Sequence, residues 1–172
     1  TTPSFVFEGL ASHYAKNGKR VLVYDHYGRG YSDRPKAKQD KVFFINQLNE
    51  LLNKLEIKEQ KFELVGYSMG GSIAAAYAAH NPGRLNKLIL IASAGAGHNL
   101  GVSAKVAKIP FIGWVLFSIF FGLQHARSTK IDTGFKSSVP KVVERQLNEL
   151  RYRGFVPSVL ASIKGILSND NY

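Results

Sequence analysis

The sequence contains no cysteine, and only one methionine and one tryptophan among its 172 residues. The absence of cysteine excludes disulfide bonds, a cysteine nucleophile and thiolate metal sites. Hydrophobic residues make up 45% of the chain and charged residues 20%, which excludes a disordered or collagen-like protein and is typical of a globular domain. We predict neither a metal ion nor a cofactor.

Acidic residues are also few: 12 Asp and Glu stand against 23 Lys and Arg, for a net charge of +11. Such an excess favours contact with anionic surfaces, whether nucleic acid, acidic lipid or a charged substrate. The basic residues are scattered, however, and the tightest groups, at 16–20 and 34–38, are short. We therefore interpret most of this charge as solubilising surface charge. Because we see neither a basic face with stacking aromatic residues nor a reading helix, we predict no nucleic-acid partner.

The first residues, 1–4, lack the basic and apolar regions of a signal peptide, and the chain does not begin with Met. We therefore leave open whether the gene product starts further upstream. On this basis a cytoplasmic location is favoured, and the oligomeric state is left open.

Short apolar runs alternate with amphipathic helical segments over residues 1–95, and this alternation is typical of an α/β fold with a mostly parallel sheet and flanking helices. The predicted helices cover residues 3–18, 38–55 and 69–80, and the predicted strands cover residues 20–24, 62–67 and 85–92. The last strand has an unbroken Leu-Ile-Leu-Ile centre, which favours a sheet covered on both faces.

Residues 96–172 have a helical and irregular pattern with no clear strand, so we divide the chain into a partial α/β core (1–95) and a helical lid or cap (96–172). The uncharged stretch 109–124 is short for a membrane-spanning helix, which needs roughly 20 apolar residues. It indicates either a helix buried in the cap or a lid over an apolar pocket that rests on a lipid interface. A further helix is predicted over 141–152.

The most specific motif is Gly66-Tyr67-Ser68-Met69-Gly70-Gly71, between a predicted strand and a predicted helix. In that context G-x-S-x-G indicates a nucleophile elbow, a strained turn that holds a serine hydroxyl above the sheet. Gly66 and Gly70 satisfy the need for small residues where the strand and helix backbones nearly touch. The backbone N–H of Met69 is then expected to stabilise an oxyanion. The alternative is a tight turn with an incidental serine.

Two further segments accompany this motif: Asp25-His26-Tyr27-Gly28-Arg29-Gly30-Tyr31-Ser32 after one predicted strand, and Asn81-Pro82-Gly83-Arg84-Leu85 before another. Together, in order and spacing, the three segments resemble the α/β-hydrolase superfamily, in its branch of lid-bearing serine hydrolases. The resemblance covers about residues 5–95. It implies that Ser68 is the nucleophile and that Met69 supplies one oxyanion-hole N–H.

The same resemblance assigns scaffold roles, and not chemistry, to Asp25, Gly28, Gly30 and Ser32. It also implies elements without a counterpart in these residues: three earlier strands with a His-Gly loop, one of which lies between the 20–24 and 62–67 strands, and two later strands that carry the triad acid and base. We therefore interpret the chain as the central portion of a larger enzyme, and we expect the segment alone to be inactive.

A serine nucleophile of this fold needs an acid and then a histidine later in the chain. The histidines after Ser68 are His80, His98 and His125, and the acids are Asp132, Glu144, Glu149 and Asp170. None of them follows a predicted strand that would bear a triad acid or base. His80 lies far along the predicted helix, about 18 Å from Ser68, and His98 has no acid between Ser68 and itself. We interpret the three histidines as solvated or packed in the cap.

These observations predict a serine hydrolase that cleaves small carboxylic esters through an acyl-enzyme on Ser68. The aromatic residues of the lid favour apolar or lipid-like substrates, and the basic residues near it favour peripheral membrane contact. Two alternatives stay open. One is a C–C bond or amide hydrolase with the same nucleophile, and the other is a non-catalytic lipid- or protein-binding module on this fold.

Overall fold

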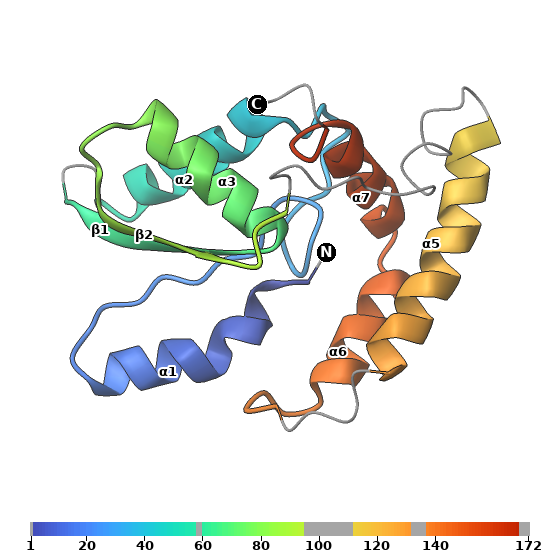
Figure 1. The fold of residues 1–172 in the computed structure, drawn as a ribbon, viewed down its shortest axis with the longest axis horizontal. Coiled ribbons are helices and arrows are strands. Elements are labelled where there is room, and N and C mark those ends of the chain that lie inside the picture. Colours follow the sequence, from blue (N-terminus) through green and yellow to red (C-terminus); the bar gives the residue numbers. More distant parts are fainter. Residues whose placement is uncertain (1, 58–59, 95–111, 132–136, 169–172) are drawn as a thin grey trace. The chain divides into compact units, whose positions relative to one another are not determined.

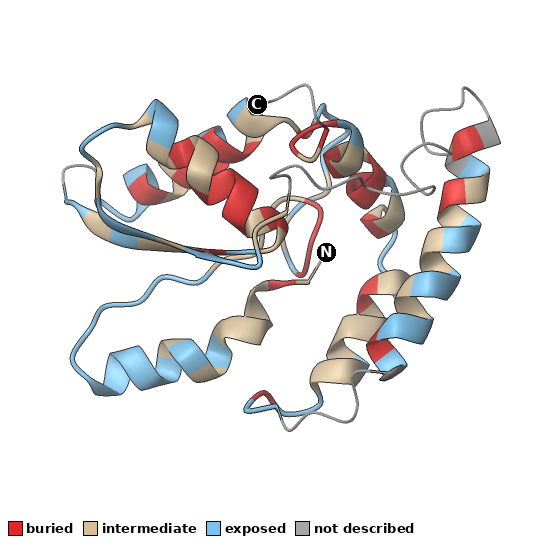
Figure 2. Ribbon diagram, viewed as in Figure 1, coloured by how far each residue is buried: buried red, intermediate tan, exposed pale blue. Residues whose placement is uncertain are grey.

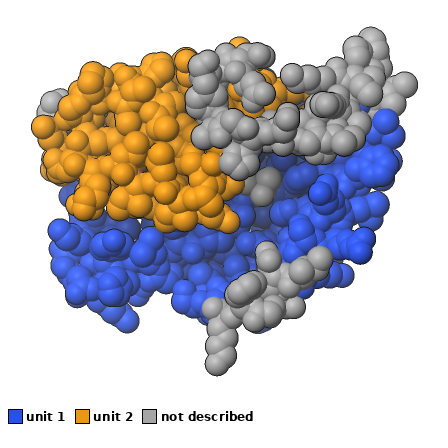
Figure 3. Space-filling model, in the orientation of Figure 1, with its two compact units in different colours: residues 1–36, 109–159 blue, residues 37–108, 160–172 orange. Residues whose placement is uncertain are grey.

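The structure is a computed structural model that describes residues 2–57, 60–94, 112–131 and 137–168. The chain divides into two compact units (Figure 3): residues 1–36 with 109–159 form the first, and residues 37–108 with 160–172 form the second. The predicted boundary at residue 95 lies outside the described residues and stays a prediction.

The second unit contains a parallel pair of strands, β1 (Phe62–Tyr67) and β2 (Leu85–Ile91), joined by helix α3 (Met69–His80) (Figure 1). Gly66 of β1 lies opposite Leu90 of β2. Helix α3 packs on both strands. The predicted strand–helix–strand order and the parallel pairing are thereby confirmed, and they place the G-x-S-x-G motif at the turn between β1 and α3.

Helix α2 (Lys41–Lys54) packs against α3 and confirms the helix predicted over 38–55. Its start is fixed by Asp40, whose side chain accepts a hydrogen bond from the backbone N–H of Phe43 at 3.1 Å. Such an N-cap is typically worth about 1 kcal/mol of stability. The core of the unit brings together apolar residues from α2, α3 and the C-terminal segment: Phe44, Met69, Ile73 and Ile166, with Phe43 and Leu167 packed against them.

The first unit is mostly helical. Its elements are η1 (Ser4–Phe7), α1 (Glu8–Lys16), α5 (Ile112–Ile131), α6 (Val142–Asn148), η3 (Glu149–Arg151) and the start of α7 (Phe155–Lys164), which continues into the second unit. The helix predicted from Pro3 is present as η1 and α1, and it stops before Gly18, whose φ of +75° suits glycine. The helix predicted over 141–152 is present as α6 and η3, whereas α7 was not predicted.

The strand predicted at residues 20–24 is wrong in this structure. These residues pair with no strand in the described part of the chain, and Val21, Leu22 and Val23 are exposed. A strand is held by hydrogen bonds to a neighbouring strand. An apolar, β-branched run therefore forms no strand where no neighbouring strand pairs with it. The family resemblance places a further strand between this segment and β1, and the described sheet has only two strands.

Strand β2 also departs from the expectation of a sheet covered on both faces. Its apolar residues Leu88, Leu90 and Ile91 are exposed (Figure 2), although they form the continuous run that usually marks a fully buried strand. Within the second unit, α3 packs on one face of this pair of strands. Among the described helices, none has the length and hydropathy needed to cross a membrane.

Candidate active site

The backbone at Ser68 has an uncommon conformation. Ser68 lies between the last residue of β1 and the first residue of α3, with φ of +52° and ψ of −121°. Side chains other than glycine rarely occupy positive φ, and such a conformation costs on the order of 1–3 kcal/mol. The surrounding structure must therefore hold this turn in place.

Three backbone hydrogen bonds hold it. The N–H of Ser68 donates to the carbonyl of Ile91 at 3.0 Å, and the N–H of Ala94 donates to the carbonyl of Ser68 at 3.0 Å. The N–H of Gly71 donates to the same carbonyl at 2.9 Å. In addition, the Ser72 hydroxyl donates to the carbonyl of Ala94. The turn is thus fastened both to its own helix and to the chain that follows β2.

The glycines of the motif allow the strand and the helix to approach closely. A Cβ on Gly66 would lie 2.7 Å from the carbonyl carbon of Gly70 and 2.7 Å from the Cα of Gly71. A Cβ on Gly71 would lie 2.7 Å from the Cβ of Ser93. Real Cβ atoms do not come this close to backbone atoms, so only glycine fits at Gly66 without a shift of the helix. The backbone of Gly70 thus lies against Gly66, and the elbow role of Gly66 and Gly70 stays a prediction.

In the part of the chain that the structure describes, the hydroxyl of Ser68 makes no hydrogen bond. Ser68 occupies the N-cap position of α3 without a capping hydrogen bond, and its side chain is partly exposed. Met69, the next residue, is buried in the core with Phe44 and Ile73, so its side chain anchors the first turn of α3. The arrangement leaves a hydroxyl at the amino end of a helix, where the helix dipole favours negative charge.

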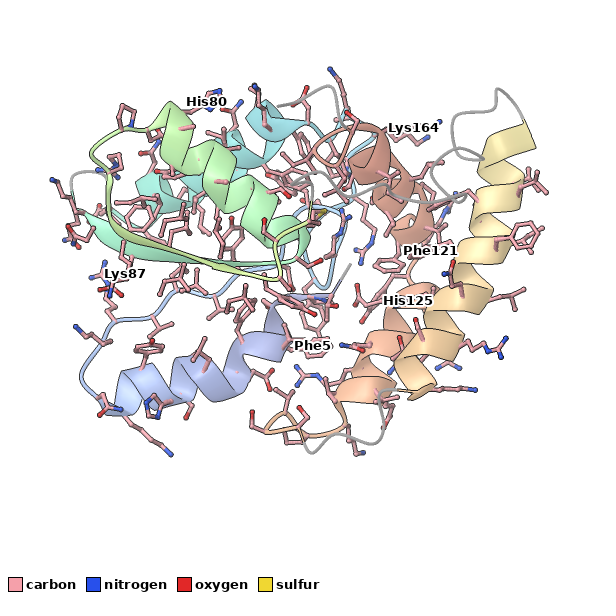
Figure 4. The ribbon with its side chains drawn as sticks, viewed as in Figure 1. Phe5, His80, Lys87, Phe121, His125 and Lys164 are labelled. Atoms are coloured by element: carbon pink, nitrogen blue, oxygen red, sulfur yellow. The ribbon has the colours of Figure 1, made fainter. Side chains whose placement is uncertain are left out.

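The structure describes two of the three candidate histidines. His80 is exposed at the end of α3, and its Nδ1 lies 2.9 Å from the carbonyl oxygen of Ala76. His125 of α5 stacks on Phe121, with ring centroids 5.4 Å apart, and also contacts Phe155 (Figure 4). Burial lowers the pKa of His125, which favours the neutral ring. His98 lies outside the described residues. The geometry of His80 and His125 agrees with the solvated and cap-packed roles expected for them.

Of the candidate acids, Glu144 is exposed, and Asp132 and Asp170 lie outside the described residues. No group of three His, Asp or Glu residues in the described part of the chain could hold a metal ion.

Asp25 organises the loop that follows the 20–24 segment. Its carboxylate accepts hydrogen bonds from the backbone N–H of Ser4 at 2.7 Å and of Tyr31 at 3.0 Å. Its carbonyl accepts a hydrogen bond from the Ser32 hydroxyl at 2.7 Å. The backbone of Gly30, at φ +52°, passes so close to this carboxylate that a Cβ would overlap it. These bonds agree with the scaffold role that the resemblance implied for Asp25, Gly30 and Ser32.

Sequence reasoning missed the use of Glu149. Its carboxylate accepts a hydrogen bond from the backbone N–H of Gly30 at 2.9 Å, and the residue is only 4% exposed. Arg29 in the same loop is 2% exposed, and burial lowers its pKa to about 10. In the sequence Glu149 resembles the exposed Glu144 of the same helical segment, so no local signal distinguishes the two. The Gly30–Glu149 hydrogen bond joins the loop that contains Gly30 to η3 within the first unit.

Comparison with known proteins agrees with this geometry. The profile of the family described as alpha/beta hydrolase fold matches residues 4–110, more than half of the chain. The chain therefore belongs to the α/β-hydrolase-fold family, and the fold class predicted from the sequence is confirmed.

Individual relatives are similar over part of their length. The chain is 40% identical over 78 residues to 2-hydroxymuconate semialdehyde hydrolase of Pseudomonas sp. strain CF600, covering 45% of this chain and 27% of that protein. It is 34% identical over 122 residues to cis-3-alkyl-4-alkyloxetan-2-one decarboxylase of Shewanella oneidensis, covering 69% of this chain and 36% of that protein. The chain thus spans between 27% and 36% of these two relatives.

A solved thermophilic esterase from Thermogutta terrifontis superposes with a TM-score of 0.74 at 20% sequence identity, covering 99% of this chain and 61% of that chain. At this identity the likeness shows the fold alone.

Proposed function

We propose that the protein is a serine hydrolase that cleaves carboxylic esters through an acyl-enzyme on Ser68. The observation that carries this proposal is the backbone of Ser68: its φ of +52° holds a hydroxyl that makes no capping hydrogen bond at the turn between β1 and α3. Strain of this kind persists only where the surroundings enforce it, and it concentrates at functional sites. Membership in a family whose curated relatives include a hydrolase adds support.

In the proposed reaction the Ser68 Oγ attacks the ester carbonyl, the alcohol leaves, and water then releases the acid from the acyl-enzyme. Negative charge develops on the carbonyl oxygen during both steps. We expect the amino end of α3, beginning with the N–H of Met69, to stabilise this charge, and one such donor is typically worth about 2.7–4 kcal/mol of barrier. A histidine base and an orienting acid complete such a site, and both follow the nucleophile in the chain order of this fold.

The proposed substrates are apolar or lipid-like esters. Support comes from the aromatic side chains gathered in the sequence around the start of α5: Phe111, Trp114, Phe117, Phe120 and Phe121. Surfaces of this composition suit acyl chains or aromatic acids better than sugars or phosphates.

Ester turnover tests this proposal. The full-length protein, and not the 172-residue segment alone, is purified and assayed on p-nitrophenyl esters of short and medium acyl length. Ser68→Ala and the control Ser128→Ala, which removes an exposed hydroxyl from α5, are assayed beside it. We expect turnover in the wild type and in Ser128→Ala, with kcat/KM rising with acyl length. Ser68→Ala is expected to lose about a millionfold in kcat, as removal of a serine nucleophile does elsewhere. Turnover that survives Ser68→Ala would reject the proposed nucleophile.

A second candidate is cleavage of a carbon–carbon bond with the same serine. The 40% identity to 2-hydroxymuconate semialdehyde hydrolase favours it. The two candidates separate on one comparison: kcat/KM for 2-hydroxymuconate semialdehyde against kcat/KM for the p-nitrophenyl esters. A preference for the semialdehyde would favour the carbon–carbon hydrolase. The absence of turnover on either substrate, with a folded protein, would favour a non-catalytic binding module.

A further inference from the structure

Helix α5 has two apolar sides with different surroundings. On the inner side Phe117 is buried, and its ring stacks on Phe121 at 5.2 Å. Phe121 and His125 point toward α7, where both contact Phe155 (Figure 4). This side therefore packs within the first unit.

Several residues along α5 are exposed (Figure 2), and four of the exposed residues are large and apolar. Val115, Ile119 and Leu123 follow one another at intervals of four residues and are 44%, 54% and 68% exposed, and the neighbouring Phe120 is 61% exposed. Residues four apart in a helix share one side, so these side chains form one stripe. We call the four residues the outer stripe. Contiguous apolar surface of this kind marks a site that contacts another apolar phase.

The charges beside the outer stripe are all positive. Arg127 continues the interval of four residues from Leu123, and Lys130 lies one turn further, and both side chains are exposed. Helix α5 contains no acidic residue. In the sequence the acid-free region extends over residues 64–131 and contains six basic residues: Arg84, Lys87, Lys105, Lys108, Arg127 and Lys130.

We propose that the outer stripe of α5 docks on the surface of an anionic lipid bilayer. The apolar side chains enter the boundary between headgroups and acyl chains, and Arg127 and Lys130 pair with anionic headgroups. The charge pattern selects this occupant over a second copy of the chain, since two chains of net charge +11 repel each other. In this proposal α5 lies along the membrane surface, with its inner side still packed within the first unit.

Vesicle co-sedimentation tests this inference on the purified protein. The vesicles are phosphatidylcholine alone, or phosphatidylcholine mixed with phosphatidylserine. Every protein carries Ser68→Ala, so that the outcome is independent of whether the proposed hydrolysis takes place. We expect binding to rise with phosphatidylserine content and to fall as salt is added.

Two sets of variants locate the surface. Ile119→Ser and Leu123→Ser are each expected to weaken binding about tenfold, and Arg127→Gln and Lys130→Gln about fivefold each. Val42→Ser is the control, because Val42 is an apolar residue on α2 that is 50% exposed, close to the 54% of Ile119, and it is expected to bind as the parent does. Circular dichroism confirms that each variant is folded.

Three outcomes would overturn the inference. The first is equal binding to the neutral and the anionic vesicles. The second is equal loss of binding in Val42→Ser and Leu123→Ser. The third is a dimer in solution that Leu123→Ser dissociates, since the outer stripe would then be covered by a second copy.

Discussion

Gly30 and Glu149 are 119 positions apart in the sequence, and the backbone N–H of Gly30 donates a hydrogen bond to the Glu149 carboxylate at 2.9 Å. Both residues are buried, and the bond links the Asp25 loop to η3. A buried N–H that loses its acceptor costs about 1–3 kcal/mol, so we expect this contact to contribute to the stability of the fold.

Replacement of Glu149 measures that contribution. We expect Glu149→Ala to lower the free energy of unfolding by about 1–3 kcal/mol, because the Gly30 N–H is left without its acceptor. Glu149→Gln keeps an acceptor oxygen and is expected to lose less. Glu144→Ala, at an exposed position on α6, is the control and is expected to stay within about 0.5 kcal/mol of wild type. Urea unfolding measures the free energy of unfolding of each variant. Equal decreases for Glu149→Ala and Glu144→Ala would contradict a stabilising role of the Gly30–Glu149 hydrogen bond.

The same carboxylate gives stability a pH dependence. Burial raises the pKa of Glu149 above its ordinary value of 4.5, opposed by the Gly30 N–H and by Arg34 and Arg29, and reinforced by Asp25. The folded state then keeps this proton to higher pH than the unfolded state does. Stability contributed by the protonated group is therefore present below about pH 4.5 and is lost as pH rises through the raised pKa.

The measurement is the difference in unfolding free energy between wild type and Glu149→Gln, taken at a series of pH values that starts below about pH 4.5 and rises. We expect the advantage of the wild type to shrink as pH rises. An advantage that grows with pH would mean that the pKa of Glu149 is lowered in the fold instead.

Gly66 tests the close approach of β1 and α3. We expect Gly66→Ala to destabilise the protein by about 1–3 kcal/mol, since its Cβ would press on the backbone of Gly70 and Gly71. Gly122→Ala is the matched control: it lies in α5 with open space around it, and alanine is the better helix former there. Thermal unfolding should move the two variants in opposite directions. A neutral Gly66→Ala would show that the turn is looser than described.

The strain at Ser68 predicts a stabilising substitution at the same position. Ser68→Gly and Ser68→Ala both remove the hydroxyl, but only glycine adopts φ of +52° without cost. After allowing for the greater freedom of glycine in the unfolded chain, we expect Ser68→Gly to be about 1 kcal/mol more stable than Ser68→Ala. Chemical denaturation of the two variants checks this. An alanine variant as stable as the glycine variant would argue against strain at this turn.

The helices and strands that were predictable are specified by residues within or next to each element. The run Phe62–Tyr67, the elbow glycines and the alanine-rich helix after Ser68 all specify the same strand–turn–helix, so β1, α3 and β2 follow from the sequence. The 20–24 segment has a similar apolar run but forms no strand, because strand pairing depends on a neighbour that local pattern does not reveal.

In the candidate site, too, local motifs were predictable and contacts between distant residues were not. The sharp turn at Ser68 was predictable because it belongs to a contiguous motif that requires glycine at set positions, whereas the catalytic role of Ser68 stays a prediction. The Gly30–Glu149 hydrogen bond was not predictable, since it joins positions 119 residues apart. In the sequence nothing distinguishes this buried glutamate from an exposed one. Helix α7 was missed as well, although it contributes the buried Phe155 against which Phe121 and His125 pack.

Covalent labelling of Ser68 tests the central claim most directly. The full-length protein is purified and treated with a fluorophosphonate, and the modified residue is located by peptide mass spectrometry, with Ser68→Ala and Ser128→Ala treated in parallel. The account predicts one label on Ser68, retained in Ser128→Ala and absent from Ser68→Ala. A folded protein that takes no label, or takes it on another serine, would contradict the claim that Ser68 is an activated nucleophile.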